Sequence, residues 1–117
     1  LNALMEGSLI PVVAPLGLGN DGQTYNINAD TVAGAISSSL NAKRMLMLTD
    51  VSGVLDKNGN LIKELSSEEA KKLIDQKVIT SGMIPKVETC IKTVENGTDA
   101  AVILDGRTPH KSIKEHF

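Results

Sequence analysis

The stretch from Met45 to Asp56 constrains the fold of this chain most strongly. It begins with an unbroken apolar run, Met45 to Leu48, and continues into small polar residues and a glycine at 49–53. An apolar run without polar alternation is typical of a strand covered on both faces, as in a parallel sheet. The change to polar residues marks the carboxyl end of that strand, where ligands bind in open α/β sheets. We therefore predict that residues 49–55 form a binding loop.

Strand and helix patterns alternate along the rest of the chain. Apolar runs predict buried strands, apolar residues at helical spacing predict helices, and Asn-Gly predicts a type I′ hairpin turn. This order predicts an α/β fold with a largely parallel sheet and helices on both faces. The predicted strands are 9–16, 43–48 and 100–104, the helices are 28–42, 66–76, 85–96 and one from Thr108, and the hairpin turn is Asn58-Gly59.

Size, charge and composition exclude several classes of function. The 117 residues suit one compact domain, and the formal net charge is −2 with no basic stripe, which argues against nucleic-acid binding. The single cysteine cannot form an internal disulfide, and no apolar run approaches the roughly 20 residues that span a bilayer. We therefore expect a cytoplasmic protein with no membrane partner. The chain does not begin with Met, and we expect it to be a fragment.

Lys86 is the most informative single residue in the pattern. It lies in the first turn of a predicted helix, where a cation is unfavourable by roughly 0.3–1 kcal/mol unless an anion binds at the same end. From position alone, an exposed and solvated lysine is the simpler interpretation, and a phosphate site is the alternative. Asp30, Asn26 and Asn28 likewise fit ordinary first-turn, turn and capping roles. Cys90 lies on an apolar stripe, and this position predicts that it packs in the core.

Other standard sites are not indicated by the sequence. The Walker A pattern does not occur, so that common phosphate loop is not predicted. His110 and His116 stand apart near the end, and no zinc-type ligand set is visible, so we expect no protein-bound metal.

Four segments together resemble the carboxy-terminal half of the acetylglutamate kinases, which are members of the amino acid kinase family. T-D-V-x-G alone is shared across that family, including carbamate, glutamate 5- and uridylate kinases. The N-x-N-A-D and G-M-I-P-K segments narrow the resemblance to the acetylglutamate member. The four segments are N-I-N-A-D at 26–30, L-T-D-V-S-G-V-L-D at 48–56, I-T-S-G-M-I-P-K-V at 79–87 and D-G-R-T-P-H at 105–110.

The resemblance implies a carbamate kinase-like fold and a phosphoryl transfer from ATP, with Mg²⁺, to the side-chain carboxylate of N-acetyl-L-glutamate, in arginine biosynthesis. It implies that Lys86 holds the γ-phosphoryl group, that Asp30 orients the catalytic lysines, and that Asn26 and Asn28 bind acetylglutamate. The nucleotide-binding residues implied by it are Thr49, Asp50, Val51, Ser52, Gly53, Val54, Leu55, Val78, Ile79 and Thr80.

The resemblance also implies what the chain lacks. Residues 1–117 would be the nucleotide-binding, carboxy-terminal part, without the amino-terminal half that carries a glycine-rich phosphate loop, a second lysine and a substrate-gripping arginine. We therefore expect the chain alone to be inactive and the full-length enzyme to be a homo-oligomer. Two alternatives stay open at this point, namely another amino acid kinase of the glutamate 5-kinase type and a non-catalytic nucleotide-binding module.

Overall fold

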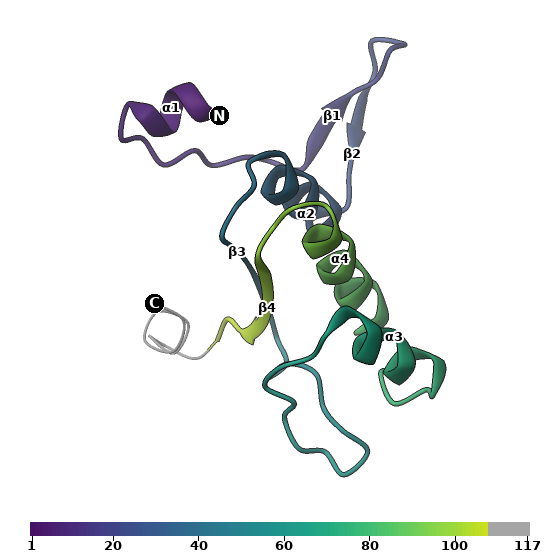
Figure 1. Cartoon of the computed structure of the whole chain (residues 1–117). Coiled ribbons are helices and arrows are strands. Elements are labelled where there is room, and N and C mark those ends of the chain that lie inside the picture. Colours follow the sequence, from purple (N-terminus) through teal and green to yellow (C-terminus); the bar gives the residue numbers. More distant parts are fainter. Residues whose placement is uncertain (108–117) are drawn as a thin grey trace.

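The structure, a computed structural model, describes residues 1–107 (Figure 1). The predicted helix from Thr108 and the two histidines lie outside the described residues. Along the chain the elements are α1 (Asn2–Glu6), β1 (Leu16–Leu18), β2 (Thr24–Asn26), α2 (Ala29–Ser39), β3 (Arg44–Thr49), α3 (Ser67–Asp75), α4 (Ile84–Glu95) and β4 (Ala100–Asp105).

The two long strands, β3 and β4, pair in parallel, as their unbroken apolar runs predicted. Their register joins Arg44 to Ala100 at one end and Thr49 to Asp105 at the other. A parallel pair requires a crossover connection, and here the chain between the strands forms α3 and α4. The α/β class and the parallel pairing are confirmed.

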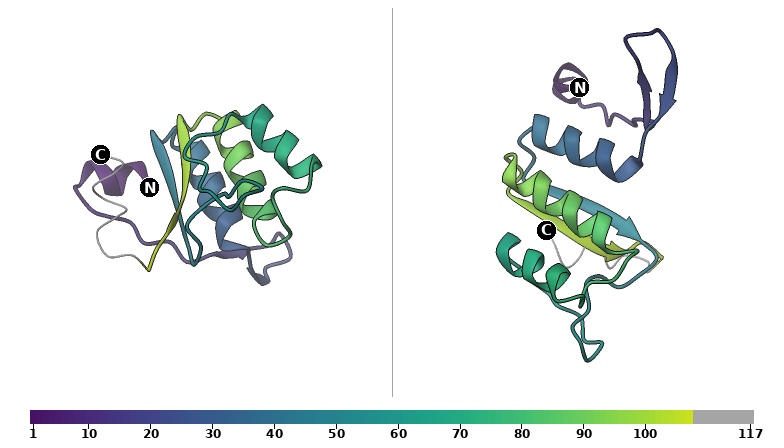
Figure 2. Two further views of the ribbon diagram at one scale, coloured as in Figure 1. Left: turned by 90° about the horizontal axis from the view of Figure 1, so that it is seen from below. Right: turned by 90° about the vertical axis from the view of Figure 1, so that its right-hand side faces the viewer.

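Helices α2 and α4 both pack on one face of this pair (Figure 2). On that face, Met45 and Met47 of β3 are each only 5% exposed. On the opposite face, Leu46 and Leu48 are 38% and 60% exposed. Within the described residues, β3 is thus covered on one face only, although its sequence is apolar on both. This apolar surface is suited to packing against further protein.

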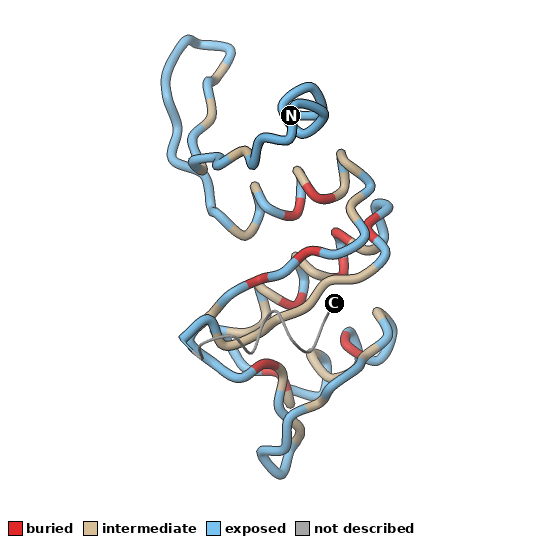
Figure 3. Tube along the Cα trace, turned by 90° about the vertical axis from the view of Figure 1, so that its left-hand side faces the viewer, coloured by how far each residue is buried: buried red, intermediate tan, exposed pale blue. Residues whose placement is uncertain are grey.

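The core lies where α3 and α4 meet the sheet. Its buried members are Ala70, Ile79, Val87 and Ile91. The start of α3 is fixed by a capping box, in which Ser66 and Glu69 each accept a hydrogen bond from the other's backbone N–H. This confirms the helix start predicted at Ser66. Among the described residues, buried positions occur only from Gly34 onward (Figure 3).

The strand predicted at residues 9–16 is wrong over most of its length. Residues 9–14 form no strand, and β1 begins only at Leu16, pairing in antiparallel fashion with β2. Pro11 and Pro15 each remove a backbone donor, which makes this segment a poor partner for a sheet ladder. The turn predicted in the glycine cluster is present, since the backbone N–H of Gly19 donates to the carbonyl of Gln23 over 2.8 Å.

The turn at Asn58-Gly59 is also built differently from the type I′ hairpin that was predicted. Only Gly59 has a positive φ, at 83°. The carboxylate of Asp56 organises the turn by accepting hydrogen bonds from the backbone N–H groups of Asn58 and Asn60, each over 2.8 Å. Leu55 and Leu61 form an isolated antiparallel bridge beneath it.

Within residues 1–107, no helix is long and apolar enough to cross a membrane.

Cys90 is half-buried on α4, as expected for a residue of the apolar stripe. Burial raises the pKa of its thiol from 9.0 to about 11, and the nearby Asp30 carboxylate acts in the same direction, against a smaller opposing effect of Lys86. Because the thiolate is the nucleophile, this environment makes Cys90 a poorly reactive thiol at neutral pH.

We therefore predict that alkylation of Cys90 in the folded chain keeps rising with pH through 9 and 10, without a plateau. Between the ordinary and the raised pKa, the folded chain contains about 100-fold less thiolate than the unfolded chain. The measurement is the rate of iodoacetamide labelling by mass spectrometry, with the urea-denatured chain as control. A plateau below pH 9 in the folded chain would contradict the account.

Candidate functional site

One edge of the sheet gathers the residues singled out from the sequence. Strands β3 and β4 end side by side at Thr49 and Asp105, and the backbone N–H of Gly106 donates to the carbonyl of Thr49 over 2.8 Å. Helices α2 and α4 run back along the strands, so their amino ends lie at this same edge (Figure 2). Helix amino ends and strand carboxyl ends are where α/β folds bind anions.

The central contact at this edge joins Asp30 of α2 to Lys86 of α4. The Lys86 Nζ donates a hydrogen bond to the Asp30 Oδ2 over 2.9 Å, across 56 residues of sequence. The two side chains are 26% and 27% exposed, so the pair is partly buried. The interpretation of Lys86 as a solvated lysine is therefore wrong, because its ammonium group is held by a charge-assisted hydrogen bond.

The pair leaves room for a ligand. A lysine ammonium group has three N–H donors, and among the described residues only Asp30 is its hydrogen-bond acceptor. About a quarter of the Lys86 side chain remains accessible. Both helix amino ends add positive potential at this point, and the Asp30 carboxylate opposes it. The arrangement favours a bound anion next to Lys86.

Asn26 and Asn28 precede α2 at the same edge. Asn26 is the last residue of β2 and is exposed. Asn28 is the N-cap of α2, and its Oδ1 accepts a hydrogen bond from the backbone N–H of Thr31 over 3.1 Å. Capping uses the oxygen of the Asn28 amide, and its NH₂ group stays available as a donor. The capping role inferred from the sequence is confirmed.

The loop after β3 is exposed at its tip and anchored at its end. Thr49 Oγ1 donates to Asp50 Oδ1 over 3.2 Å, and residues 50–52 are exposed. Gly53 is buried with φ 133°, and a Cβ at this position would lie 2.9 Å from the Cδ1 of Leu61. Val54 accepts a backbone hydrogen bond from Ile62 over 2.9 Å. The glycine therefore lets the loop turn tightly against residues 61–62.

The segment Val78 to Thr80 leads into α4. The Ile79 side chain is 3% exposed and belongs to the core, so this residue can offer only backbone groups to a ligand. The carbonyl of Thr80 accepts hydrogen bonds from the N–H groups of Met83 and Ile84, over 2.9 and 3.2 Å. These bonds orient the first turn of the helix that carries Lys86.

Arg107 is a further charged group at this edge that the sequence did not single out. Its Nε and Nη2 donate to the two carboxylate oxygens of Asp105 over 3.0 and 2.9 Å. This fork raises the pKa of Arg107, and the charge of Asp50 contributes in the same direction. The only signal for it in the sequence was the D-G-R stretch.

Within residues 1–107, no group of three His, Cys, Asp or Glu side chains could hold a metal ion.

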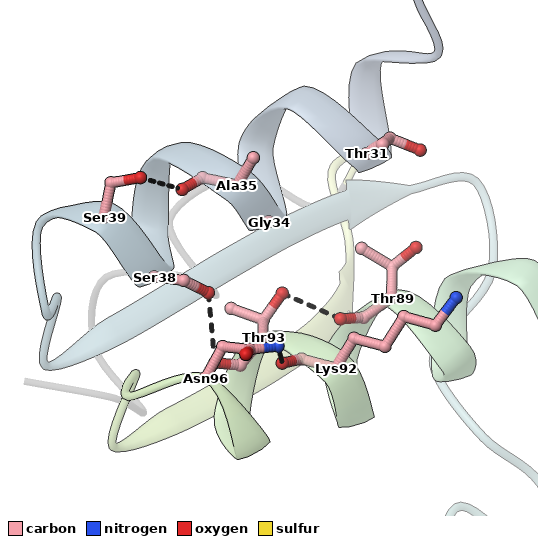
Figure 4. Close-up of a pocket in the computed structure, with 9 residues that line it drawn as sticks. All are labelled: Thr31, Gly34, Ala35, Ser38, Ser39, Thr89, Lys92, Thr93 and Asn96. Carbon is pink, nitrogen blue, oxygen red and sulfur yellow. Dashed lines mark hydrogen bonds between the residues drawn. The ribbon is translucent and has the colours of Figure 1, made fainter.

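A groove of about 490 Å³ runs between α2 and α4 (Figure 4). Most of its lining side chains are small, and hydrogen bonds cross it or follow its walls, such as the one from Ser38 Oγ to the carbonyl of Thr93 over 3.3 Å. The end of the groove at Thr31 and Thr89 is the end nearest in sequence to the ion pair. The lining residues are Thr31, Gly34, Ala35, Ser38, Ser39, Thr89, Lys92, Thr93 and Asn96.

Comparison with known proteins identifies relatives that match the whole chain. An acetylglutamate kinase of Rhodospirillum centenum is 58% identical over all 117 residues, and one of Gluconobacter oxydans is 61% identical over the same length. The chain spans 38% and 40% of the length of these two relatives.

Solved structures share the fold. The smu.665 protein of Streptococcus mutans UA159 matches 89% of this chain and 42% of its own, with TM-score 0.81 and 39% identity. An N-acetylglutamate synthase of Neisseria gonorrhoeae, complexed with coenzyme A and L-arginine, matches 90% of this chain and 24% of its own, with TM-score 0.83 and 26% identity. The sequence profile of the amino acid kinase family matches residues 1–105. The chain therefore belongs to the amino acid kinase family.

Proposed function

We propose that the chain is the nucleotide-binding part of an acetylglutamate kinase. The reaction is transfer of the γ-phosphoryl group of ATP to the side-chain carboxylate of N-acetyl-L-glutamate, which gives an acyl phosphate for arginine biosynthesis. The observation that carries the proposal is the Asp30–Lys86 pair at the carboxyl edge of β3 and β4. The names of the relatives that match the whole chain support the same acceptor.

The chemistry of this reaction fits a site built from a cation and helix amino ends. The acceptor carboxylate is already ionised at pH 7, so no general base is required. The difficulty lies in bringing two anions together in line, and fixed positive groups lower that barrier by positioning and charge stabilisation. In this proposal, the Lys86 ammonium group contacts the γ-phosphoryl group, and Asp30 holds that ammonium group in place.

The neighbouring segments provide the other contacts in the proposal. Residues 49–55 and 78–80 line the site for the nucleoside end of ATP, and Asn26 with Asn28 contacts acetylglutamate. Mg²⁺ accompanies the nucleotide and neutralises phosphate charge, since this ion keeps several waters and needs few protein ligands.

A longer chain completes the proposed site. One lysine and two helix ends are few positive groups for two anionic substrates. We propose that the part of the relatives without a counterpart here supplies a glycine-rich phosphate loop, a second lysine and an arginine. The exposed apolar face of β3, with Leu46 and Leu48, supports this division, because further protein is needed to cover it. The proposed full-length enzyme is a homo-oligomer in the cytoplasm.

One observation favours keeping a second candidate. The neisserial synthase has the same fold with a TM-score of 0.83, so this fold also occurs in a protein named for another activity. The two alternatives are a non-catalytic nucleotide-binding module and a kinase with glutamate as acceptor. Isothermal titration of the full-length protein with ATP-Mg²⁺, acetylglutamate and glutamate separates the three, since the module binds only the nucleotide.

The role of Lys86 gives the most direct mutational prediction. In the full-length enzyme, Lys86→Ala lowers kcat by about 100- to 1,000-fold, because it removes a group aimed at the transition-state charge. The KM for ATP changes little, since the nucleoside end is bound elsewhere. Steady-state kinetics provides the measurement, and Lys72→Ala, which removes an exposed lysine on α3, is the matched control. An unchanged kcat in Lys86→Ala would refute the role.

The division of the site gives a second prediction. The purified 117-residue chain forms no acetylglutamyl phosphate, because the groups that stabilise the transferred phosphoryl group are incomplete. Trapping the acyl phosphate with hydroxylamine measures the product, with the Gluconobacter oxydans enzyme as positive control. Product formation by the chain alone at a rate near that of the control would show that the site is complete.

A further inference from the structure

We propose that Gly34 is a positioning residue for the phosphoryl transfer. Its missing side chain lets α2 approach α4 closely enough for Asp30 to reach Lys86. The expected effect on kcat rests on the proposed function. The expected effect on the Asp30–Lys86 contact rests only on the packing of α2 against α4.

The contact at Gly34 is too close for any side chain. A Cβ at this position would lie 2.6 Å from the Oγ1 of Thr93 and 3.1 Å from the Cγ2 of Thr89, both on α4. Thr93 cannot easily move away, since it is only 2% exposed and its Oγ1 donates to the carbonyl of Thr89 over 2.7 Å. An added methyl group would therefore push the two helices apart.

The same helix faces carry the ion pair. Gly34 follows Asp30 by four residues, and Thr89 and Thr93 follow Lys86 by three and seven residues. Residues at these spacings share one face of a helix. The Gly34 contact and the Asp30–Lys86 pair therefore lie on one seam between α2 and α4, about one helical turn apart.

The other contacts on this seam lie toward the carboxyl end of α2. Ser38 Oγ donates to the carbonyl of Thr93 over 3.3 Å, and the buried hydroxyls of Ser37 and Thr98 are 2.9 Å apart. They hold α2 at the end away from the substrates. A side chain added at Gly34 would lie between the hydrogen-bonded carboxyl end of α2 and the ion pair. It would therefore tilt the amino end of α2 away from α4.

The choice of glycine is difficult to explain by helix formation. Glycine in the middle of a helix is less favourable than alanine, and Gly34 does not have the positive φ that would require a glycine. Close approach of α4 is the remaining physical reason. The hydrogen bond of 2.9 Å between Lys86 and Asp30 has little tolerance, because such bonds weaken strongly beyond about 3.5 Å.

The experiment compares four forms of the full-length enzyme, namely the wild type, Gly34→Ala, Thr93→Ala and the double variant. We expect Gly34→Ala to lower kcat by about 10- to 100-fold, the effect of a misplacement near 1 Å, with the KM for ATP within about twofold of wild type. Truncating Thr93 makes space for the new methyl group, so the double variant should recover the kcat of Thr93→Ala. Ala33→Ser, which adds one atom on the exposed side of α2, is the control for altering that helix.

A structural readout separates this inference from the proposed function. In the 117-residue chain, nuclear Overhauser contacts between the Lys86 ε-methylene and Asp30 β-methylene should weaken in Gly34→Ala and return in the double variant. If the wild type transfers no phosphoryl group to acetylglutamate, the proposed function fails, and these contacts still test the positioning.

Two results would overturn the inference, namely wild-type kcat and contacts in Gly34→Ala, or a loss that persists in the double variant. If Gly34→Ala does not fold, the double variant decides. A kcat equal to that of Thr93→Ala supports the positioning role, and a lower kcat contradicts it.

Discussion

The ion pair between Asp30 and Lys86 is the interaction on which the rest of the site depends. It joins the amino ends of two helices, and the helix dipoles act with opposite sign on the energies of its two charged partners. Asp30 is favourable where it stands, whereas Lys86 at the start of α4 is unfavourable without a partner. The carboxylate offsets that cost, and the two helix amino ends add positive potential beside the pair. A partly exposed site of this kind attracts an anion without a metal ligand set of its own.

The geometry of the pair follows from features some distance from it. The parallel pairing of β3 and β4 brings their carboxyl ends to one edge, and the helices packed on one face return their amino ends to that edge. Gly34 then sets how closely α2 approaches α4. The fold of residues 1–107 thus presents a partly exposed ammonium group at the sheet edge, with an open apolar sheet face beside it. In our proposal, the remainder of a longer chain covers that face and brings the second substrate.

The sequence predicted the elements whose signals are local. The apolar runs of β3 and β4, the Ser66 cap and the proline-led start of α4 were all identified, because each depends on neighbouring residues only. The strand at 9–16 was not formed, since a strand requires a partner that a local pattern does not reveal. The turn at Asn58-Gly59 was decided by the Asp56 side chain rather than by its own dipeptide.

The site was predictable only in part, for the same physical reason. Lys86 and Asp30 lie 56 residues apart, and position alone indicated a solvated lysine and a simple first-turn acid. The family resemblance assigned roles to both, whereas the contact between them and the close approach at Gly34 became visible only in three dimensions. For Ile79 the motif was misleading in another way, because its place in a predicted binding segment gave no sign that its side chain lies in the core.

The most direct test of this account is a crystal structure of the full-length protein with acetylglutamate, Mg²⁺ and a non-hydrolysable ATP analogue. The account predicts the nucleoside over residues 49–55 and the γ-phosphoryl group within hydrogen-bond distance of the Lys86 ammonium group, with Asp30 still on its other side. A nucleotide bound elsewhere, or a γ-phosphoryl group with no contact to Lys86, would contradict it.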